Sequence, residues 1–285
     1  MTILQSEYLL GVYEKSMPNH FSLSEKLVTA RDAGFDYLEL SIDETDEKLA
    51  RLSMNRSQRR ELIEQMSDTM MPIRTLCLSG HRRFPLGDPD AKTRETGLEI
   101  MSRAIDLAAS LGVRIIQLAG YDVYYKESDE STRALFHQNL HKSVEMAARS
   151  GVVLAFETME TPFMDTVAKA LSWVRALNSP YLQIYPDVGN LTNAALLYGH
   201  DVVEDIRSGS GNMVALHLKE TAPGVYREMD YGTGHVDFVS CIRAGWESGV
   251  RMFTGEFWYR EGSDARCVLQ NSRLFLREMI SRHDS

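Results

Sequence analysis

Short runs of β-branched and other apolar residues recur along the chain, and each is followed by a stretch with apolar residues three and four positions apart. Runs of the first kind predict strands, stretches of the second kind predict amphipathic helices, and their alternation is typical of a parallel sheet. The predicted strands are Leu9–Tyr13, Tyr37–Ser41, Ile73–Leu78, Arg114–Leu118, Val152–Glu157, Leu182–Tyr185, Met213–Leu218 and Met252–Phe257. Clear helical patterns are Glu25–Ala33, Thr93–Leu111, Ser131–Arg149, Asp165–Leu177 and Arg266–Ser281.

Glycines mark where several predicted helices end and the next strand begins. Gly34, Gly112, Gly151 and Gly249 each follow a helical pattern directly, where a left-handed residue commonly terminates a helix. Eight strand–helix units in 285 residues leave about 36 residues per unit, close to what a closed barrel needs. We therefore predict an α/β fold, a (β/α)₈ TIM barrel, formed as a single domain by residues 1–285.

A doubly wound open sheet is the alternative architecture. Its dinucleotide-binding form would carry G-x-G-x-x-G after an early strand. Neither Gly209-Ser210-Gly211 nor Gly232-Thr233-Gly234 fits that pattern.

Composition and charge narrow the possible partners. The net charge of −9 disfavours binding to nucleic acid, and 44% hydrophobic with 25% charged residues is typical of a soluble globular protein. No window approaches the roughly 18 apolar residues of a membrane span. The three cysteines, Cys77, Cys241 and Cys267, are far apart and odd in number, so we expect no disulfide framework. Because Met1 to Leu10 contain no basic region followed by a long apolar stretch, and no membrane span is predicted, we expect a cytoplasmic location.

Four consecutive predicted strands each carry a potential metal ligand near their carboxyl end. These residues are Glu157, Asp187, His217 and Glu256, separated by 30, 30 and 39 positions. In a parallel barrel the carboxyl ends of the strands converge on one mouth, where the reacting groups lie. Three carboxylates and one imidazole suit one divalent ion, such as Zn²⁺, Mn²⁺, Co²⁺ or Mg²⁺.

Two of the four residues can also act as acid and base. Glu157 and Glu256 come from strands separated by two others, so they can flank a bound ligand from opposite sides. Epimerisation beside a carbonyl needs one group to remove a proton and another to return a proton on the opposite face. Each carboxylate could instead have a purely structural role, as a helix N-cap or an ion-pair partner.

The loop after the third predicted strand carries adjacent cations that could bind a phosphate group. His81, Arg82 and Arg83 lie there, and Lys219 points to the same side of its strand as His217 by period-two alternation. Arg binds phosphate oxygens through planar, bidentate donors. The alternative is that the arginines are solvated or paired with surface carboxylates and that Lys219 forms a salt bridge.

Several other residues invite a functional interpretation. His137 and His141 are four apart on a predicted helix, but the HExxH pattern fails, so we expect surface histidines. Glu14 and Glu39 could hydrogen-bond a sugar hydroxyl or merely cap the barrel rim. Trp258 could wall the pocket or fill the core.

Long stretches of the chain resemble one known family nearly end to end. The chain is similar to the L-ribulose-5-phosphate 3-epimerases, also called L-xylulose-5-phosphate 3-epimerases, among the xylose-isomerase-like barrels. The segments that carry this resemblance are LGVYEKSMP, ELSIDETDEKLARL, CLSGHRRFPLG, GLEIMSRAI, IIQLAGYDVYY, QIYPDVGNL, HLKETAPGV and GHVDF.

The resemblance implies a specific reaction and a specific site. It implies interconversion of L-ribulose 5-phosphate and L-xylulose 5-phosphate, by proton abstraction at C3 and an enediolate, in the degradation of L-ascorbate or related pentoses. Glu157, Asp187, His217 and Glu256 match the metal set, and Glu157 and Glu256 match the acid/base pair. The loop with His81 falls where phosphate recognition is plausible. The resemblance also implies a homodimer.

Two other enzyme classes remain open from the sequence. A hexulose-6-phosphate isomerase, or another aldose–ketose isomerase of sugar phosphates, could use the same metal cradle. A barrel endonuclease is a more distant alternative, which predicts a basic face and additional histidines at the rim. The net charge of −9 argues against it. A sugar-sensing protein without activity would leave the opposed glutamates unexplained.

Overall fold

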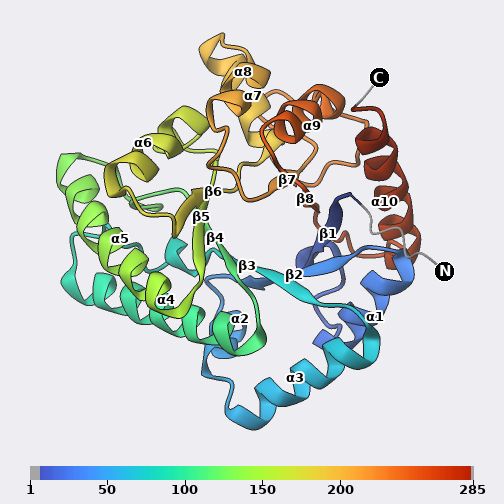
Figure 1. Ribbon diagram of the computed structural model, residues 1–285, viewed down its shortest axis with the longest axis horizontal. Helices are drawn as coiled ribbons and strands as arrows, with labels where there is room; N and C mark the ends of the chain where they lie inside the picture. The colour runs from blue at the N-terminus through green and yellow to red at the C-terminus, as the bar shows by residue number, and fades with distance from the viewer. Residues whose placement is uncertain (1–6, 284–285) are drawn as a thin grey trace.

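A computed structural model describes residues 7–283 as eight parallel strands that form a barrel surrounded by helices (Figure 1). The predicted (β/α)₈ TIM barrel is confirmed. The strands pair in the order β6-β5-β4-β3-β2-β1-β8-β7. They are β1 Leu9–Tyr13, β2 Tyr37–Ile42, β3 Ile73–Leu78, β4 Ile115–Ala119, β5 Val153–Glu157, β6 Leu182–Ile184, β7 Leu216–Leu218 and β8 Met252–Gly255.

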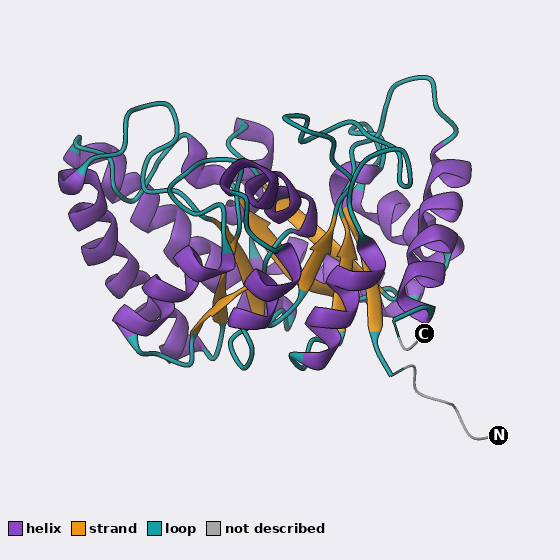
Figure 2. Cartoon of the chain, turned by 90° about the horizontal axis from the view of Figure 1, so that it is seen from above, coloured by secondary structure: helices purple, strands orange, loops and turns teal. Residues whose placement is uncertain are grey.

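The helices cover the outside of the barrel, and the longest loops gather at the carboxyl ends of the strands (Figure 2). The α-helices are α1 Leu23–Ala33, α2 Asp46–Ala50, α3 Arg56–Thr69, α4 Ala91–Leu111, α5 Glu130–Ser150, α6 Val167–Leu177, α7 Val188–Tyr198, α8 Val202–Ser208, α9 Phe238–Glu247 and α10 Ala265–Ser281. There are also three short 3₁₀ helices. η1 Glu14–Ser16 follows β1, η2 Arg51–Ser53 follows α2, and η3 Gly80–Arg82 follows β3. Within residues 7–283, no helix is long and apolar enough to cross a membrane.

The barrel closes between β6 and β7 through isolated bridges. Ile184 pairs with Met213 and Asp187 pairs with His217, so both strands are shorter than the sequence predicted. Pro186 lies between the two bridges, and because it has no N–H it cannot continue the ladder of β6. The interruption lets the chain leave the sheet at Asp187, where α7 begins.

The interior of the barrel is largely polar, whereas the apolar core lies between the strands and the helices. Tyr37 crosses the interior and its hydroxyl bonds Thr254 Oγ1 at 2.6 Å. Gly11 makes this possible, because a Cβ atom at that position would lie 2.3 Å from the Tyr37 ring. The polar interior supports the residues above it at the mouth.

A buried ion cluster ties the first two strand–helix units together. Glu14, immediately after β1, is fully buried and contacts Lys26 and Lys48 at 2.9 and 2.6 Å, while Arg51 binds both of its carboxylate oxygens. Its Oε2 also accepts the Ser41 backbone N–H at 2.8 Å. Burial disfavours the charged carboxylate, yet the hydrogen bond from Arg51 and the three positive charges hold the pKa of Glu14 well below its usual value.

We expect Glu14→Gln to lower the free energy of unfolding by about 3–5 kcal/mol, because it leaves buried cations without their counter-charge. The lowered pKa means that the stabilisation is complete above the unfolded pKa, about 4.3, and is lost as the pH falls below it. Urea unfolding of both proteins at pH 7 and pH 4 measures this. The control is Glu64→Gln, which removes an exposed pair with Arg60 and should cost under about 1 kcal/mol. Equal losses in the two variants would contradict the prediction.

Candidate metal centre

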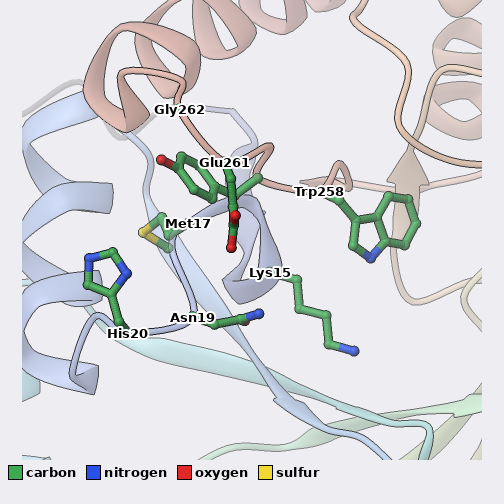
Figure 3. Close-up of a pocket in the computed structure, with 8 residues that line it drawn as sticks. Lys15, Met17, Asn19, His20, Trp258, Glu261 and Gly262 are labelled. Atoms are coloured by element: carbon green, nitrogen blue, oxygen red, sulfur yellow. The ribbon is translucent and has the colours of Figure 1, made fainter.

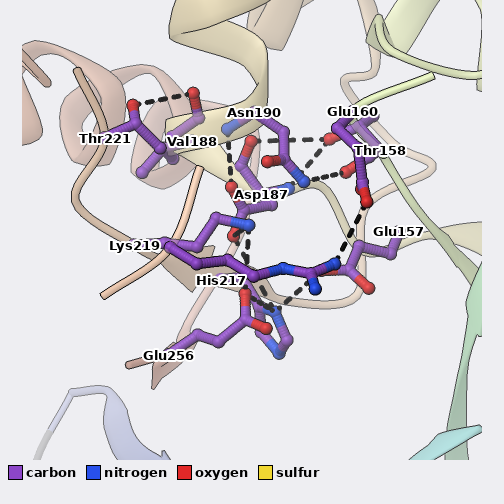
Figure 4. Close-up of polar contacts among 12 residues, drawn as sticks. Glu157, Thr158, Glu160, Asp187, Val188, Asn190, His217, Lys219, Thr221 and Glu256 are labelled. Atoms are coloured by element: carbon purple, nitrogen blue, oxygen red, sulfur yellow. Dashed lines mark hydrogen bonds and ion pairs between the residues drawn. The ribbon is translucent and has the colours of Figure 1, made fainter. Parts of the chain in front are cut away.

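Four acidic and histidine side chains meet at the carboxyl end of the barrel (Figure 4). Glu157 ends β5, Asp187 precedes α7, His217 lies in β7, and Glu256 follows β8. One ligand atom from each residue lies within 4.8 Å of all the others, and all four side chains are buried. The structure therefore brings together the four residues that the sequence singled out as metal ligands.

His217 lies at the centre of this group. Its Nδ1 atom is 3.3 Å from Glu157 Oε1, 3.2 Å from Glu256 Oε2 and 4.0 Å from Asp187 Oδ2. Burial disfavours its charged form, but Glu39 and Glu256 raise the pKa of His217 well above its usual value. One nitrogen and three carboxylates thus face a common point.

Asp187 serves the helix and the cluster with different oxygens. Its Oδ1 accepts the backbone N–H of Asn190 at 2.7 Å and caps the N-terminus of α7. Its Oδ2 is buried and accepts no hydrogen bond from any described residue. Lys219 Nζ lies 3.3 Å from this oxygen without a hydrogen bond. Because a buried carboxylate oxygen without hydrogen bonds is costly, Oδ2 is a fitting ligand for a cation. The N-cap and the ligand interpretations of this residue are therefore compatible.

The carboxylates differ in their electrostatic surroundings. Burial and the nearby charge of Glu256 raise the pKa of Glu157, and burial raises the pKa of Asp187 well above its usual value. Glu256 is equally buried, but Lys219 and His217 hold its pKa well below the usual range. A bound divalent cation would favour the charged form of all three, and oxygen-rich donors with one imidazole suit such an ion.

Lys219, predicted to bind phosphate, lies against the candidate metal-binding cluster. Its Nζ is 3.3 Å from Asp187 Oδ2 and 3.4 Å from Glu256 Oε2. Burial disfavours the ammonium, yet Asp187, Glu256 and Glu157 raise its pKa above the usual value. The contacts match the salt-bridge alternative, although Lys219 also lines the pocket beside Trp258.

The three residues of the predicted phosphate loop lie in different environments. His81 is buried and its Nε2 is 3.0 Å from the Gly97 carbonyl, and burial lowers its pKa to about 4. Arg83 is exposed and binds Asp46 at 2.7 Å. Only Arg82 of the three lines the pocket of the cluster.

Arg82 has an incomplete set of partners. Its guanidinium lies over the Tyr124 ring, 4.5 Å from the centroid, and is 3.8 Å from the Glu44 carboxylate. Its Nε is buried and lacks a hydrogen-bond partner among the described residues. This guanidinium is therefore suited to an anionic group that enters the pocket.

Comparison with known proteins agrees with this geometry. The sequence matches the xylose isomerase-like TIM barrel family over residues 27–279. It is 41% identical over 281 residues, 98% of both chains, to "L-ribulose-5-phosphate 3-epimerase UlaE" of Escherichia coli O139:H28 (strain E24377A / ETEC). The chain belongs to the L-ribulose-5-phosphate 3-epimerase family. The resemblance that the sequence motifs indicated is confirmed.

Solved structures of other proteins share the fold of this chain, at lower sequence identity than the relative from Escherichia coli. The structure titled "Structure of L-ribulose 3-epimerase" has a TM-score of 0.78 at 19% identity and covers 97% of this chain and 96% of its own. A structure of the IOLI protein "with a binding zinc atom" has a TM-score of 0.80 at 18% identity, with 96% and 99% covered. At these identities the likeness establishes the barrel fold.

The epimerase-family pocket also contains residues that sequence reasoning had not assigned to it. Lys15, Asn190 and Arg227 line it, and Trp258 forms part of its wall, one of the two predicted roles of this residue. A second cavity of about 590 Å³ shares Lys15 and Trp258 and reaches the residues around His20 and Glu261 (Figure 3). The position of Lys15, two residues after the end of β1, was the signal that could have identified it.

The remaining residues that the sequence singled out lie outside the pocket of the candidate metal centre. Glu14 belongs to the buried ion cluster below the rim, and Glu39 lies inside the barrel against His217. His137 and His141 are exposed on α5, as predicted, and His141 lies 3.7 Å from Glu145. The cluster has one histidine, whereas the endonuclease alternative predicted several at the rim.

We expect added Zn²⁺ or Mn²⁺ to raise the melting temperature of chelator-treated protein. A ligand at about 1,000 times its Kd stabilises the folded state by about 4 kcal/mol, because it binds only that state. Differential scanning fluorimetry with a metal series measures the shift. The variant His217→Gln should lose the response and His137→Gln should keep it. An equal response in both variants would place the metal elsewhere.

Proposed function

We propose that this protein is a metal-dependent isomerase that interconverts L-ribulose 5-phosphate and L-xylulose 5-phosphate by epimerisation at C3. The observation that carries the proposal is the convergence of Glu157 and Glu256, from β5 and β8, on one buried cluster with Asp187 and His217. Both glutamates line the same pocket. The name of the family supplies the sugar.

The two glutamates exchange protons with the substrate. One carboxylate removes the proton from C3, and the other, as a carboxylic acid, delivers a proton to the opposite face of the same carbon. Return of the proton to the first face regenerates the starting sugar, so inversion requires two groups. The surroundings of the two glutamates differ: burial and Glu256 raise the pKa of Glu157, whereas Lys219 and His217 lower the pKa of Glu256 despite its burial.

The remaining residues of the cluster hold the reacting groups in place. Glu157, Asp187, His217 and Glu256 would hold one divalent ion, which when bound polarises the carbonyl next to C3 and offsets the negative charge of the enediolate. Lys219 adds a positive charge at Glu256 and Asp187. Asp187 keeps its orientation because α7 holds its other oxygen.

We expect Glu256→Gln and Glu157→Gln each to lower kcat by at least about 10²–10⁴-fold, since each removes one proton-transfer group. The measurement follows L-xylulose 5-phosphate by NMR in D₂O with metal-replete protein. Parent protein should form L-ribulose 5-phosphate that carries deuterium at C3, and chelator should abolish the reaction. The exposed Glu64→Gln serves as a control with full activity.

The same experiment separates the alternatives. Deuterium at C1 without deuterium at C3 would replace epimerisation by aldose–ketose isomerisation. No turnover of the pentose with a metal still bound would redirect the search to hexulose 6-phosphates and to unphosphorylated ketoses.

We propose Arg82 as the residue of its loop that contacts the phosphate, since it lines the pocket with incomplete partners. Arg82→Met should raise KM for the phosphorylated ketose about 10–100-fold, corresponding to the 1.5–3 kcal/mol of a charged hydrogen bond. Arg83→Met, with its outward pair to Asp46, should change KM little. Steady-state kinetics of both variants test the assignment, and equal effects would contradict it.

A further inference from the structure

Glu39 is a buried carboxylate that touches the candidate metal cluster from below. It lies in the middle of β2 and its side chain points into the barrel with no exposed surface. Its Oε1 is 2.6 Å from His217 Nε2, and its Oε2 accepts a hydrogen bond from the Thr75 hydroxyl at 2.7 Å. Thr75 is its register partner on β3. Both carboxylate oxygens thus have a defined partner inside the barrel.

This contact determines which nitrogen of His217 faces the cluster. An ionised carboxylate accepts hydrogen bonds and cannot donate them, so Nε2 carries the proton in the contact with Glu39. Without a metal, Nδ1 faces carboxylates as well and can carry a second proton. When a cation replaces that proton, the lone pair on Nδ1 faces the cation, while Nε2 keeps its proton. Nδ1 is the atom that lies 3.3 Å from Glu157 and 3.2 Å from Glu256. Glu39 therefore selects the tautomer that can bind a cation.

The surrounding residues keep the imidazole plane in the same orientation. The Tyr185 ring packs edge-on, with centroids 4.8 Å apart, and the Gln117 amide nitrogen is 3.1 Å from the ring nitrogens. Neither residue has the negative charge that would increase the basicity of the ring. Of the three residues that contact the ring away from the cluster, Glu39 both orients the ring and places a negative charge at Nε2.

A purely structural role does not explain a carboxylate at this position. Glu39 adds a negative charge to an interior that already holds Glu157, Asp187 and Glu256, and burial of like charges without a compensating cation is unfavourable. Glu39 also does not line the pocket, so the sugar-hydroxyl role considered from the sequence lacks a contact surface. Its one close partner among the cluster residues is His217.

We propose that Glu39, held by Thr75, is a positioning residue that sets the tautomer and orientation of His217 and thereby the affinity of the cluster for a divalent metal. This inference rests on the metal centre of the proposed function and adds a residue outside its four ligands. Outer partners of ligating histidines commonly contribute 10–100-fold to metal affinity.

The test compares Zn²⁺ affinity of the metal-free parent protein, Glu39→Gln, Thr75→Val and Asp205→Asn by competition with a chromophoric chelator. Glu39→Gln should weaken binding about 10–100-fold. Thr75→Val, which frees one oxygen of Glu39, should weaken it on the order of 3–10-fold. Asp205→Asn is the matched control, because Asp205 is a buried carboxylate that binds the first backbone N–H groups of α6. Its Zn²⁺ affinity should equal that of the parent.

A second readout separates positioning from folding. In chelator, Glu39→Gln loses the buried partner of His217 and can melt lower than the parent, so each protein is compared with its own metal-free form. Added Zn²⁺ should raise the melting temperature of Glu39→Gln less than that of the parent. If Glu39→Gln does not fold, the Zn²⁺ affinity of Thr75→Val decides whether Glu39 has the positioning role.

Affinities of both variants within twofold of the parent would overturn the positioning role alone. Unchanged affinity with a lost kcat would assign Glu39 to the substrate instead. A parent that binds no Zn²⁺ would overturn the metal centre and this inference with it.

Discussion

Concentrated negative charge inside the barrel is the constraint on which the site depends. Glu39, Glu157, Asp187 and Glu256 are all buried within reach of one imidazole. Carboxylates in such an arrangement repel one another and resist ionisation unless cations compensate them. Lys219 supplies one positive charge from within the chain. His217, whose pKa is raised by Glu39 and Glu256 despite its burial, can supply a second, and a divalent ion bound between the carboxylates would supply two more.

The barrel holds the side chains of the cluster on regular secondary structure. Glu157 and His217 project from strands, and Asp187 is fixed by the capping bond to α7. Ligands on rigid elements keep their separation when the substrate enters, which a loop-borne ligand would not guarantee. In the polar layer below, the hydroxyl groups of Tyr37 and Thr254 hydrogen-bond each other at 2.6 Å.

The rim of the mouth is organised differently. The ion cluster around Glu14 joins the loops after β1 and β2 through long buried side chains. Arg227, in contrast, lies on the exposed segment after β7 and binds Glu160, in the segment after β5, at 3.1 Å. The first side of the mouth is thus held by buried charge pairs and the other by surface pairs, which are weaker.

The sequence by itself determined the barrel and the meeting of Glu157, Asp187, His217 and Glu256. Strand–helix alternation specifies a parallel sheet. Parallel strands in a closed barrel bring their carboxyl ends to one mouth, whatever the length and conformation of the loops. Only the tertiary structure decided that Lys219 pairs with the metal cluster, that His81 and Arg83 contact other partners than the pocket, and that Glu39 bonds His217. Those outcomes depend on rotamers and on neighbours far apart in the chain, such as the 178 positions between Glu39 and His217. Local periodicity carries no information about such contacts.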